Sequence, residues 1–568
     1  MDDDLRDAVR RAAEVHALAN AVEHGSEAQT GAVLGPLMGD HPEFREHGDE
    51  VPGVVGEVVA RVNDLSAAER RERLAAAAPD RLAAIDADDD GDEEPALPDL
   101  PNATAGEVTM RVAPNPNGPW HVGHARMAAV IGTYKQRYDG RFVCRFDDTD
   151  PDTKRPDLGA YDAILDAIDY LGFTPDEVIR ASDRLETYYD HARDLIDAGG
   201  AYTCSCPQAA FSELKNAGEA CPHRDKTAEQ THAEFERMVD GDYGEGELVL
   251  RVRTDIEHPN PALRDWVAFR IVDRPHPRET AADYRCWPML DFQSGVDDHL
   301  TGVSHIVRGI DLQDSAKRQQ FVYDYFDWTY PEVVHWGHVQ VDEFDAPLST
   351  STLSEMVADG RLDGWDDPRA PTLAALERRG IRGEAVVAAM VELGTSTSDV
   401  ELSMSSVYAE NRELVDDRAD RYFLVRDGER LPVTDTPAEG TPPVHPDHEE
   451  RGRRSIPAGD AVYLEPDDVP APDERVWLKG LGGVRRSGDR LVGTDDGIEA
   501  VRDEGVPVVH WVPDDGVPVR LRTPDGDVTG RAEPGFAGAA VDEVVQFERV
   551  CFARVDARDP AVAYFAHR

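Results

Sequence analysis

The chain has 568 residues, 40% of them hydrophobic, and a formal net charge of −53. One hydrophobic core does not support so long a chain, so we expect about three to five domains. No run of about 18 apolar residues occurs, and the N-terminus is an acidic amphipathic segment rather than a basic, apolar leader. These features exclude a membrane-spanning protein and predict a cytoplasmic one without a membrane partner.

The charge is unusual because acidic residues occur along the whole chain and only six lysines accompany 54 arginines. Such a net charge is typical of disorder, but the apolar content and regular patterning argue against it. In multimolar salt the Debye length falls to about 3 Å or less, so an acidic surface stays hydrated without repelling itself. The composition therefore predicts a halophilic protein. A nucleic-acid partner is not excluded, because local arginine clusters can still bind phosphates once repulsion is screened.

The N-terminal part of the chain predicts helices followed by a linker. Residues 1–85 have helical periodicity with Ala-rich, charged faces, and 86–106 form an acidic linker. From residue 107 the sequence predicts a short strand, a Pro/Gly/Asn loop, a helix from His121 to about Tyr138 and a buried strand over 141–146. This order is typical of a parallel, doubly wound α/β sheet of the Rossmann type.

We assign this Rossmann-type domain to residues 107–345, with a connective insertion at about 200–285. Residues 346–427 predict a polar loop followed by helices. From 428 to 568, Pro, Gly and Asp separate short alternating runs, which indicates one or two antiparallel β-barrels.

The first chemical motif is His121-Val122-Gly123-His124, between the first strand and the following helix. Adenylate formation passes through a five-coordinate α-phosphate whose negative charge must be met by preorganised donors. Two imidazoles three residues apart at a helix start face the same side and add to the positive end of the helix dipole. Gly123 lets an adenine lie close to the backbone. An isolated motif of this kind would indicate two surface histidines, but here APNPNGP precedes it.

With that loop, the motif resembles the class I glutamyl- and glutaminyl-tRNA synthetases, and in particular the glutamyl-tRNA synthetases of archaeal type. The resemblance spans about 107–425 and continues through RFDDTDP at 145–151, WPMLDFQSGVDDHLTGVSHIVRGID at 287–311 and GWDDPRAPTLAALERRGI at 364–381. It implies a Rossmann-type catalytic domain with a connective insertion, a helical segment contacting the tRNA stem and an anticodon-binding region of β-barrels. It also implies attachment of glutamate to tRNA(Glu) through a glutamyl-adenylate, with ATP and Mg²⁺.

The resemblance also implies site residues. Arg111 and Asp147 are expected to contact the amino acid, Asp147 through its α-amino group, although Asp147 alone could simply form a turn. Arg308 is expected to face the substrate carboxylate and to favour glutamate over glutamine, since a buried guanidinium facing a neutral amide would stay unpaired. An ion pair of Arg308 with Asp297 or Asp298 is the structural alternative. The expected ATP-binding residues are Pro114, Asn115, Gly118, His121, Gly123, His124, Ser349 and Ser351, with His121 and His124 as catalytic residues.

Two positions depart from the family pattern. Leu290 stands where many relatives carry tyrosine. The loop that should close over the ATP phosphates is PLSTSTLSE at 347–355, which keeps Ser349 and Ser351 but has no lysine. Mg²⁺ or an arginine that the sequence does not identify must supply the missing charge.

Cysteines and a histidine form a second constellation, Cys204-x-Cys206, fourteen residues, then Cys221-x-His223. Three thiolates and one imidazole suit a closed, tetrahedral, structural Zn²⁺ site. The alternative is a vestigial site that has lost its ion.

Two other functions stay open at this point: a glutaminyl enzyme, and a tRNA-binding protein without catalysis, which the lysine-free loop would suit. The sequence also leaves open whether a glutamyl enzyme would charge tRNA(Gln) besides tRNA(Glu).

Overall fold

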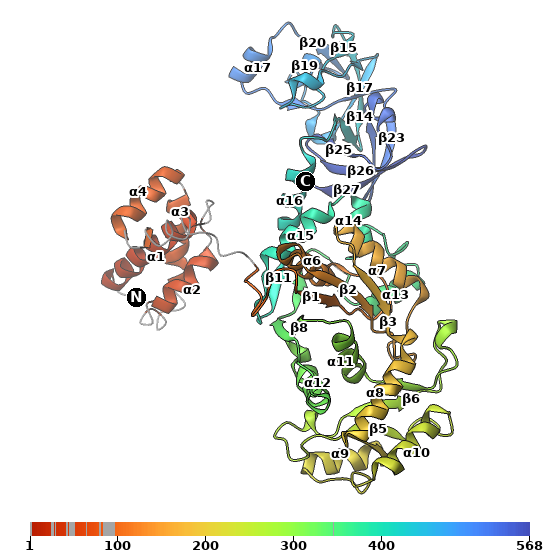
Figure 1. The fold of residues 1–568 in the computed structure, drawn as a ribbon. Helices are drawn as coiled ribbons and strands as arrows, with labels where there is room; N and C mark the ends of the chain where they lie inside the picture. Colours follow the sequence, from red (N-terminus) through yellow and green to blue (C-terminus); the bar gives the residue numbers. More distant parts are fainter. Residues whose placement is uncertain are drawn as a thin grey trace. The chain divides into compact units, whose positions relative to one another are not determined.

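The computed structural model describes residues 3–23, 28, 30–40, 44, 51–63, 65–78, 81–82, 97–344 and 346–568. The chain divides into two compact units, Met1–Pro98 and Asp99–Arg568 (Figure 1). Most of the predicted acidic linker, residues 86–96, lies outside the described residues.

The first unit is helical, as predicted. It contains α1 (Asp3–Glu23), α2 (Thr30–Asp40), α3 (Val51–Asn63) and α4 (Ala67–Ala77), and α1 packs against the other three. The valines of α3 recur every three or four residues and are buried in the core of this unit. That spacing places them on one face of the helix, which explains why this polar, acidic segment folds.

The centre of the second unit is a parallel sheet. Strands β1 (Thr109–Val112), β2 (Arg141–Phe146) and β3 (Glu177–Arg180) pair in that order, and β8 (His305–Gly309) pairs with β9 (Glu332–Trp336). The Ser304 N–H donates to the Thr109 carbonyl at 2.9 Å, which places β8 beside β1. The strand order therefore reverses between β1 and β8, and ligands of such sheets bind outside the carboxyl ends of the strands at that point.

Helices connect these strands (Figure 1). Their bounds are α6 (Ala125–Tyr138), α7 (Leu158–Tyr170), α8 (Leu185–Asp197), α11 (Leu290–Leu300) and α12 (Gln313–Phe326). The helix predicted from His121 begins one residue later, as a 3₁₀ turn over Val122–His124 that runs into α6.

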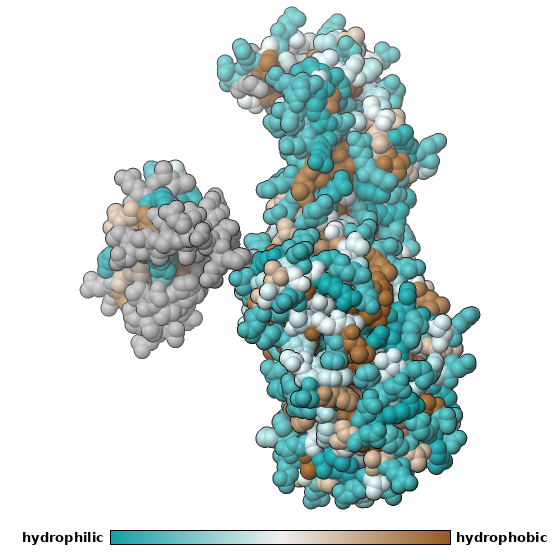
Figure 2. Space-filling view, viewed as in Figure 1, coloured by the Kyte–Doolittle hydropathy of each residue, from teal (hydrophilic) through white to brown (hydrophobic). Residues whose placement is uncertain are grey.

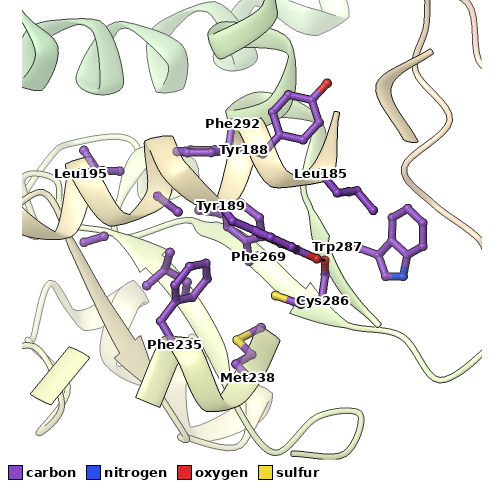
Figure 3. Close-up of a cluster of buried hydrophobic side chains, with 14 of the residues drawn as sticks. Leu185, Tyr188, Tyr189, Leu195, Phe235, Met238, Phe269, Cys286, Trp287 and Phe292 are labelled. Atoms are coloured by element: carbon purple, nitrogen blue, oxygen red, sulfur yellow. Dashed lines mark hydrogen bonds between the residues drawn. The ribbon is translucent and has the colours of Figure 1, made fainter. Parts of the chain in front are cut away.

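The insertion forms a small antiparallel sheet, with β4 (Ala201–Cys204), β5 (Val249–Val252), β6 (Val267–Ile271) and β7 (Cys286–Pro288), and with helices α9 (Gln208–Ala217) and α10 (Ala228–Val239). Figure 3 shows the core between α8, α10 and this sheet: Tyr189 of α8 lies beside Phe235 of α10 and Phe269 of β6. The ring centroids of Phe235 and Phe269 lie 5.4 Å apart in an edge-on arrangement. This core joins the insertion to α8 and α11 of the Rossmann-type part.

After the Rossmann sheet come the helices α13 (Thr350–Ala358), α14 (Leu373–Arg379), α15 (Gly383–Glu392) and α16 (Met404–Val415), and the parallel pair β10 (Val339–Val341) and β11 (Val400–Leu402). Two seven-stranded, barrel-like sheets follow. Their strands are β12 (Arg421–Tyr422), β13 (Leu424–Arg426), β14 (Glu429–Thr434), β17 (Ala461–Leu464), β18 (Arg475–Leu478), β19 (Gly482–Ser487), β20 (Arg490–Gly493), β21 (Val508–Val509), β22 (Val512–Pro513), β23 (Val517–Thr523), β24 (Gly526–Ala532), β25 (Val544–Phe547), β26 (Cys551–Arg558) and β27 (Ala561–His567).

The β-rich C-terminal region was predicted, but its sheets are mixed rather than purely antiparallel. Four neighbouring pairs, β12/β25, β23/β27, β14/β20 and β18/β21, are parallel. Short alternating runs indicate strands but not the direction in which two of them pair. Among the described residues, no helix is both long and apolar enough to cross a bilayer.

Candidate active site

A pocket of about 150 Å³ lies at the carboxyl ends of β1 and β8, where the strand order reverses. Arg111, near the end of β1, Asp147, directly after β2, and Arg308, near the end of β8, all line it. The three residues predicted to contact the amino acid are thus brought to one place from distant parts of the chain. Leu290, the departure from the family pattern, lies on the rim of the same pocket and is 42% exposed.

The floor of the pocket is a buried network of opposite charges. Asp298 accepts a hydrogen bond from Arg145 Nη1 at 2.6 Å and from Arg111 Nε at 3.1 Å. Arg145 Nε also donates to Asp147 Oδ1 at 2.7 Å. Although burial opposes ionisation, the two guanidinium groups lower the pKa of Asp298 to about 2. Asp298 is therefore a carboxylate at neutral pH, and it fixes the orientation of both arginines.

A second buried acid supports the network. Asp297 accepts hydrogen bonds from Tyr188 Oη at 2.6 Å and Arg184 Nε at 2.8 Å. The Gln293 amide bridges the two acids, since its Nε2 donates to Asp147 at 3.1 Å and to Asp297 at 3.2 Å. Neither Arg145 nor Gln293 was predicted as a site residue from the sequence. Asp297 and Asp298 are adjacent acids in a largely buried helix, and buried acids require polar partners. Arg145 and Gln293 are two of these partners, so the acid pair was the signal that could have led to them.

Arg308 has a different environment from the other two arginines. It is 6% exposed, its Nη1 donates to Gln319 Oε1 at 3.3 Å, and its buried Nε has no hydrogen-bond partner among the described residues. In the part of the chain that the structure describes, the alternative ion pair with Asp297 or Asp298 does not form. Burial and the nearby charge of Arg111 lower the pKa of Arg308. Among the described residues, no carboxylate forms an ion pair with this guanidinium, although the charge of Asp298 acts on it from farther away.

The two motif histidines stack at the start of the helix that follows β1. Their ring centroids are 3.7 Å apart with 26° between the planes. Burial lowers the pKa of His121 to about 4 and, together with His121, that of His124 to about 3. Both rings are therefore neutral near pH 7, and a neutral imidazole can donate one N–H hydrogen bond. The His121 backbone N–H points to His124 Nδ1 at 3.3 Å, so the ring proton of His124 is on Nε2.

The loop between β1 and these histidines connects several predicted residues. The Pro114 carbonyl accepts the Asp147 N–H at 2.9 Å, and Asn115 Nδ2 donates to the Asp147 carbonyl at 2.9 Å. A side chain at Gly118 would lie 2.3 Å from Thr350 Cγ2, so glycine permits the close approach of α13. A side chain at Gly123 would lie 3.2 Å from the His121 ring. The loop thus leads into the histidine motif, binds Asp147, and lies against the start of α13, where Ser349 and Ser351 are found.

The lysine-free segment is the start of a helix rather than an irregular loop. Ser349 is the N-cap of α13, and its side chain accepts the Thr352 N–H at 3.5 Å and lies 3.2 Å from the Ser351 hydroxyl. The first amides of a helix lack carbonyl partners and present the positive end of the helix dipole. This helix start is a source of anion-binding groups that the composition of the segment did not reveal.

The four predicted metal ligands converge in the insertion. One ligand atom from each of Cys204, Cys206, Cys221 and His223 lies within 4.8 Å of all the others. Cys204 Sγ lies 3.8 Å from Cys221 Sγ, and Cys206 Sγ lies 3.3 Å from His223 Nδ1. Zn–S bonds of about 2.3 Å at tetrahedral angles require sulfur atoms about 3.8 Å apart. The second nitrogen of His223 lies 3.0 Å from the Ser205 hydroxyl, which orients the ring. The donor set and spacing fit zinc.

A histidine pair at the start of a helix, beside an amino-acid-sized pocket at the switch point of a parallel sheet, defines a class I aminoacyl-tRNA synthetase. Comparison with family models agrees: residues 107–417 match the catalytic domain of the class I tRNA synthetases for E and Q. Residues 419–500 and 508–556 match two anticodon-binding domains of the same group. The chain belongs to this family, whose members require ATP and Mg²⁺.

Within the family the similarity is to glutamate–tRNA ligases. The enzyme of Haloarcula marismortui is 67% identical and that of Natronomonas pharaonis 68% identical, each over the full length of both chains. The glutamate–tRNA ligase of Methanosarcina acetivorans is 42% identical over 98% of each chain. The resemblance to the archaeal, halophilic type of glutamyl-tRNA synthetase, and the fold that it implies, are confirmed.

Proposed function

We propose that this chain is a glutamate–tRNA ligase that activates glutamate with ATP as glutamyl-adenylate and transfers the glutamyl group to tRNA(Glu). The observation that carries the proposal is Arg308 in the switch-point pocket, whose guanidinium contacts the neutral Gln319 amide and forms no ion pair with a described residue. A buried guanidinium without a carboxylate partner favours a ligand that brings its own negative charge. Glutamate and glutamine differ in that charge, so the pocket favours glutamate. The names of the full-length relatives support the same activity.

The other ends of the amino acid find complementary groups in the pocket. Asp147 keeps most of the hydrogen-bonding capacity of Oδ2, which lies 3.5 Å from Arg145 Nη2, and this oxygen can accept the α-ammonium group. Arg111 lies across the pocket, oriented by Asp298, and is suited to a carboxylate oxygen of the substrate. The α-carboxylate is the group that attacks the α-phosphate of ATP, so its orientation decides whether the adenylate forms.

We place the phosphates at the histidine motif, at the start of the helix that follows β1. The neutral Nε2–H of His124 and the ring of His121 supply donors for the charge that develops on the α-phosphate. Gly118 and Gly123 would border the nucleotide, since Gly118 lets the start of α13 approach the loop and Gly123 lets the His121 ring lie close to the backbone. Pro114 and Asn115 hold the loop to Asp147. Ser349, Ser351 and the first amides of α13 can bind phosphate oxygens. Mg²⁺ would be held mainly by the ATP phosphates and would supply the positive charge that this segment lacks.

We further propose a structural Zn²⁺ held by Cys204, Cys206, Cys221 and His223. All four positions are filled by protein ligands, which leaves no open position for catalysis. The site would join β4 to the segment after α9, and so fix the tip of the insertion. Because tRNA is found in the cytoplasm, we place the enzyme there. The barrel-like sheets would contact the anticodon.

One aminoacylation experiment tests the activity. Purified protein in high KCl is given either tRNA(Glu) or tRNA(Gln), and either glutamate or glutamine, with ATP and Mg²⁺. We expect glutamate on tRNA(Glu), and the tRNA(Gln) arm shows whether the enzyme accepts both tRNAs. Arg308→Gln should lower kcat/KM for glutamate roughly ten- to hundredfold while affecting glutamine much less. Charging of glutamine instead of glutamate would identify a glutaminyl enzyme, and charging of neither would leave a tRNA-binding protein.

A further inference from the structure

Gln319 of α12 is the residue that holds Arg308. It is 1% exposed and lines the same pocket. Its Oε1 accepts hydrogen bonds from Arg308 Nη1 at 3.3 Å and from the Tyr330 hydroxyl at 2.6 Å. The side chain is thus held from one side by Tyr330, which follows α12, while it contacts the guanidinium on the other.

The chemistry of these partners fixes which end of the amide faces Arg308. A guanidinium can only donate, so the atom beside it must be the amide oxygen and not the NH₂ group. With the amide held this way by Arg308, the Tyr330 hydroxyl donates to the same oxygen and adds a second hydrogen bond to it. The hydrogen-bond network therefore defines one orientation of Gln319, and through it one position of Arg308.

The other two buried arginines of this site have partners of a different kind. Arg111 and Arg145 meet carboxylates, since Asp298 contacts both and Asp147 contacts Arg145. Arg308 alone among these three meets a neutral amide. A carboxylate at position 319 would be almost the same size as glutamine and would complete an ion pair with Arg308. The amide instead orients the guanidinium and leaves its charge available.

We propose that Gln319 is a positioning residue that sets the choice of glutamate: it fixes Arg308 in the pocket without neutralising it. This inference rests on the proposed function, in which Arg308 faces the side-chain carboxylate of the substrate. Gln319 itself need not touch the substrate. Its contribution is that the compensating negative charge must come from the ligand, so glutamate binds where glutamine leaves the guanidinium unpaired.

Gln319→Glu tests the proposal because it replaces only the NH₂ group of the amide by an oxygen. The carboxyl group that this substitution introduces is buried beside an arginine, so it ionises, pairs with Arg308 and competes with the substrate carboxylate. We expect the KM for glutamate to rise roughly tenfold or more, with the KM for glutamine and for ATP nearly unchanged. Gln320→Glu is the matched control, because Gln320 is the next residue of α12, is exposed and contacts Asp324 instead. It adds the same charge outside the pocket and should leave both amino acids unaffected.

Two further variants keep the proposal testable if Gln319→Glu does not fold. Gln319→Met keeps the length of the side chain but removes the acceptor, and Tyr330→Phe removes one of the two donors. Both should raise the KM for glutamate, Tyr330→Phe by roughly two- to tenfold, and both should move the glutamate-to-glutamine ratio of kcat/KM toward glutamine. Melting temperatures of all variants are measured in the same KCl.

The outcomes separate this inference from the proposed function. If Arg308→Gln shifts the ratio toward glutamine but Gln319→Glu, Gln319→Met and Tyr330→Phe do not, Gln319 is only structural and the inference is wrong. If these variants weaken the use of glutamate, glutamine and ATP equally, Gln319 is again only structural. If the wild-type protein does not charge glutamate, or if Arg308→Gln leaves the ratio unchanged, the proposed function or its specificity assignment fails, whatever Gln319 does.

Discussion

Arg145 and Asp298 form an ion pair in which Nη1 lies 2.6 Å from Oδ1 and each side chain is 1% exposed. This pair connects two residues that line the switch-point pocket, because Arg145 also binds Asp147 and Asp298 also binds Arg111. Two residues expected to contact the substrate are thus connected by two that the sequence analysis did not assign to the site. These ion pairs hold the side chains of the pocket in defined orientations, which is what an enzyme that must align a carboxylate with a phosphate requires.

The first prediction concerns Asp298. Asp298→Asn should leave Arg111 and Arg145 with too little negative charge and lower the free energy of unfolding by about 3 kcal/mol or more, because one partner of a buried ion pair is lost. Chemical denaturation in constant KCl measures this loss. The depressed pKa of Asp298, about 2, means that its stabilising contribution is complete above about pH 4 and declines as the pH falls toward 2. The difference between variant and wild type should therefore shrink over that acid range.

Asp359→Asn is the control for this measurement. Asp359 pairs with Arg361 at 3.5 Å, but both side chains are more than half exposed, so its loss should change stability little. An Asp298→Asn variant as stable as Asp359→Asn, with an unchanged KM for glutamate, would contradict the role given to the buried network.

Much of this architecture was predictable from local patterns. The strand, loop, helix and strand around His121 follow from periodicity and loop composition, and the three pocket residues follow from their motifs. Arg145 was not identified because its importance depends on Asp297 and Asp298, which are about 150 residues away in the sequence. Gln319 and Tyr330 were also missed. Nothing in QDSAKRQQFVYDYF distinguishes Gln319 from Gln320, and without Gln319 there is no reason to choose Tyr330. Only the packing of α12 against α11 and its other neighbours buries the first glutamine and exposes the second.

The protonation states of the motif histidines were also not predictable. Their spacing indicated a pair of donors at a helix start, but the spacing does not show that the rings stack or are buried. Burial then keeps both rings neutral. Similarly, the residues PLSTSTLSE suggested a polar loop, whereas Ser349 caps a helix. In both cases the decisive quantity is the environment of the side chain, which composition alone does not contain.

The second prediction concerns His124, whose Nε2–H is the proposed donor to the α-phosphate. Removing one such donor in His124→Ala should lower the rate of ATP–pyrophosphate exchange roughly a hundred- to thousandfold. His124→Gln retains an N–H at a similar distance from the backbone and should keep more activity than His124→Ala. The assay contains tRNA(Glu), and tRNA binding is measured separately to show that it survives. Wild-type exchange rates in His124→Ala would contradict the assignment of the motif.

The same histidines predict how stability depends on pH. The folded protein holds His121 and His124 neutral down to about pH 4 and about pH 3, whereas in the unfolded chain they take up protons near pH 6.5. The unfolded state therefore binds more protons between these values, so stability is complete above about pH 6.5 and falls as the pH decreases toward 3. Replacing both residues by glutamine should reduce this dependence of the free energy of unfolding on pH. Chemical denaturation at about pH 4.5 and about pH 7 measures the difference.

The third prediction is one zinc ion per chain. Metal analysis of protein purified without chelator should find it, and Cys221→Ser should lose it together with part of the thermal stability of the insertion. Cys551→Ser is a suitable control, since Cys551 is also a buried free cysteine but lies in β26, outside the cluster. Well-folded, active wild-type protein without zinc would reject the site.

The last prediction concerns salt. The chain carries a formal charge of −53, and hydrophilic residues cover most of the face of the second unit seen in Figure 2. At about 0.1 M salt the Debye length is about 10 Å, which allows neighbouring carboxylates to repel one another, and at multimolar salt it falls to about 3 Å or less. The folded state gathers these charges more closely than the unfolded chain does, so screening should stabilise it. We expect the melting temperature and the charging activity to rise together with KCl.

An uncharged osmolyte separates screening from a general effect of solutes. Sucrose stabilises compact states because it is excluded from protein surfaces, but it does not screen charge. If self-repulsion of the acidic surface is the cause, sucrose in about 0.1 M KCl should recover only a small part of the stability that concentrated KCl gives. A melting temperature that is flat between about 0.1 M and about 3 M KCl would refute the halophilic interpretation. Equal stabilisation by sucrose would instead assign the effect to solute exclusion, and the surface charge would then serve solubility alone.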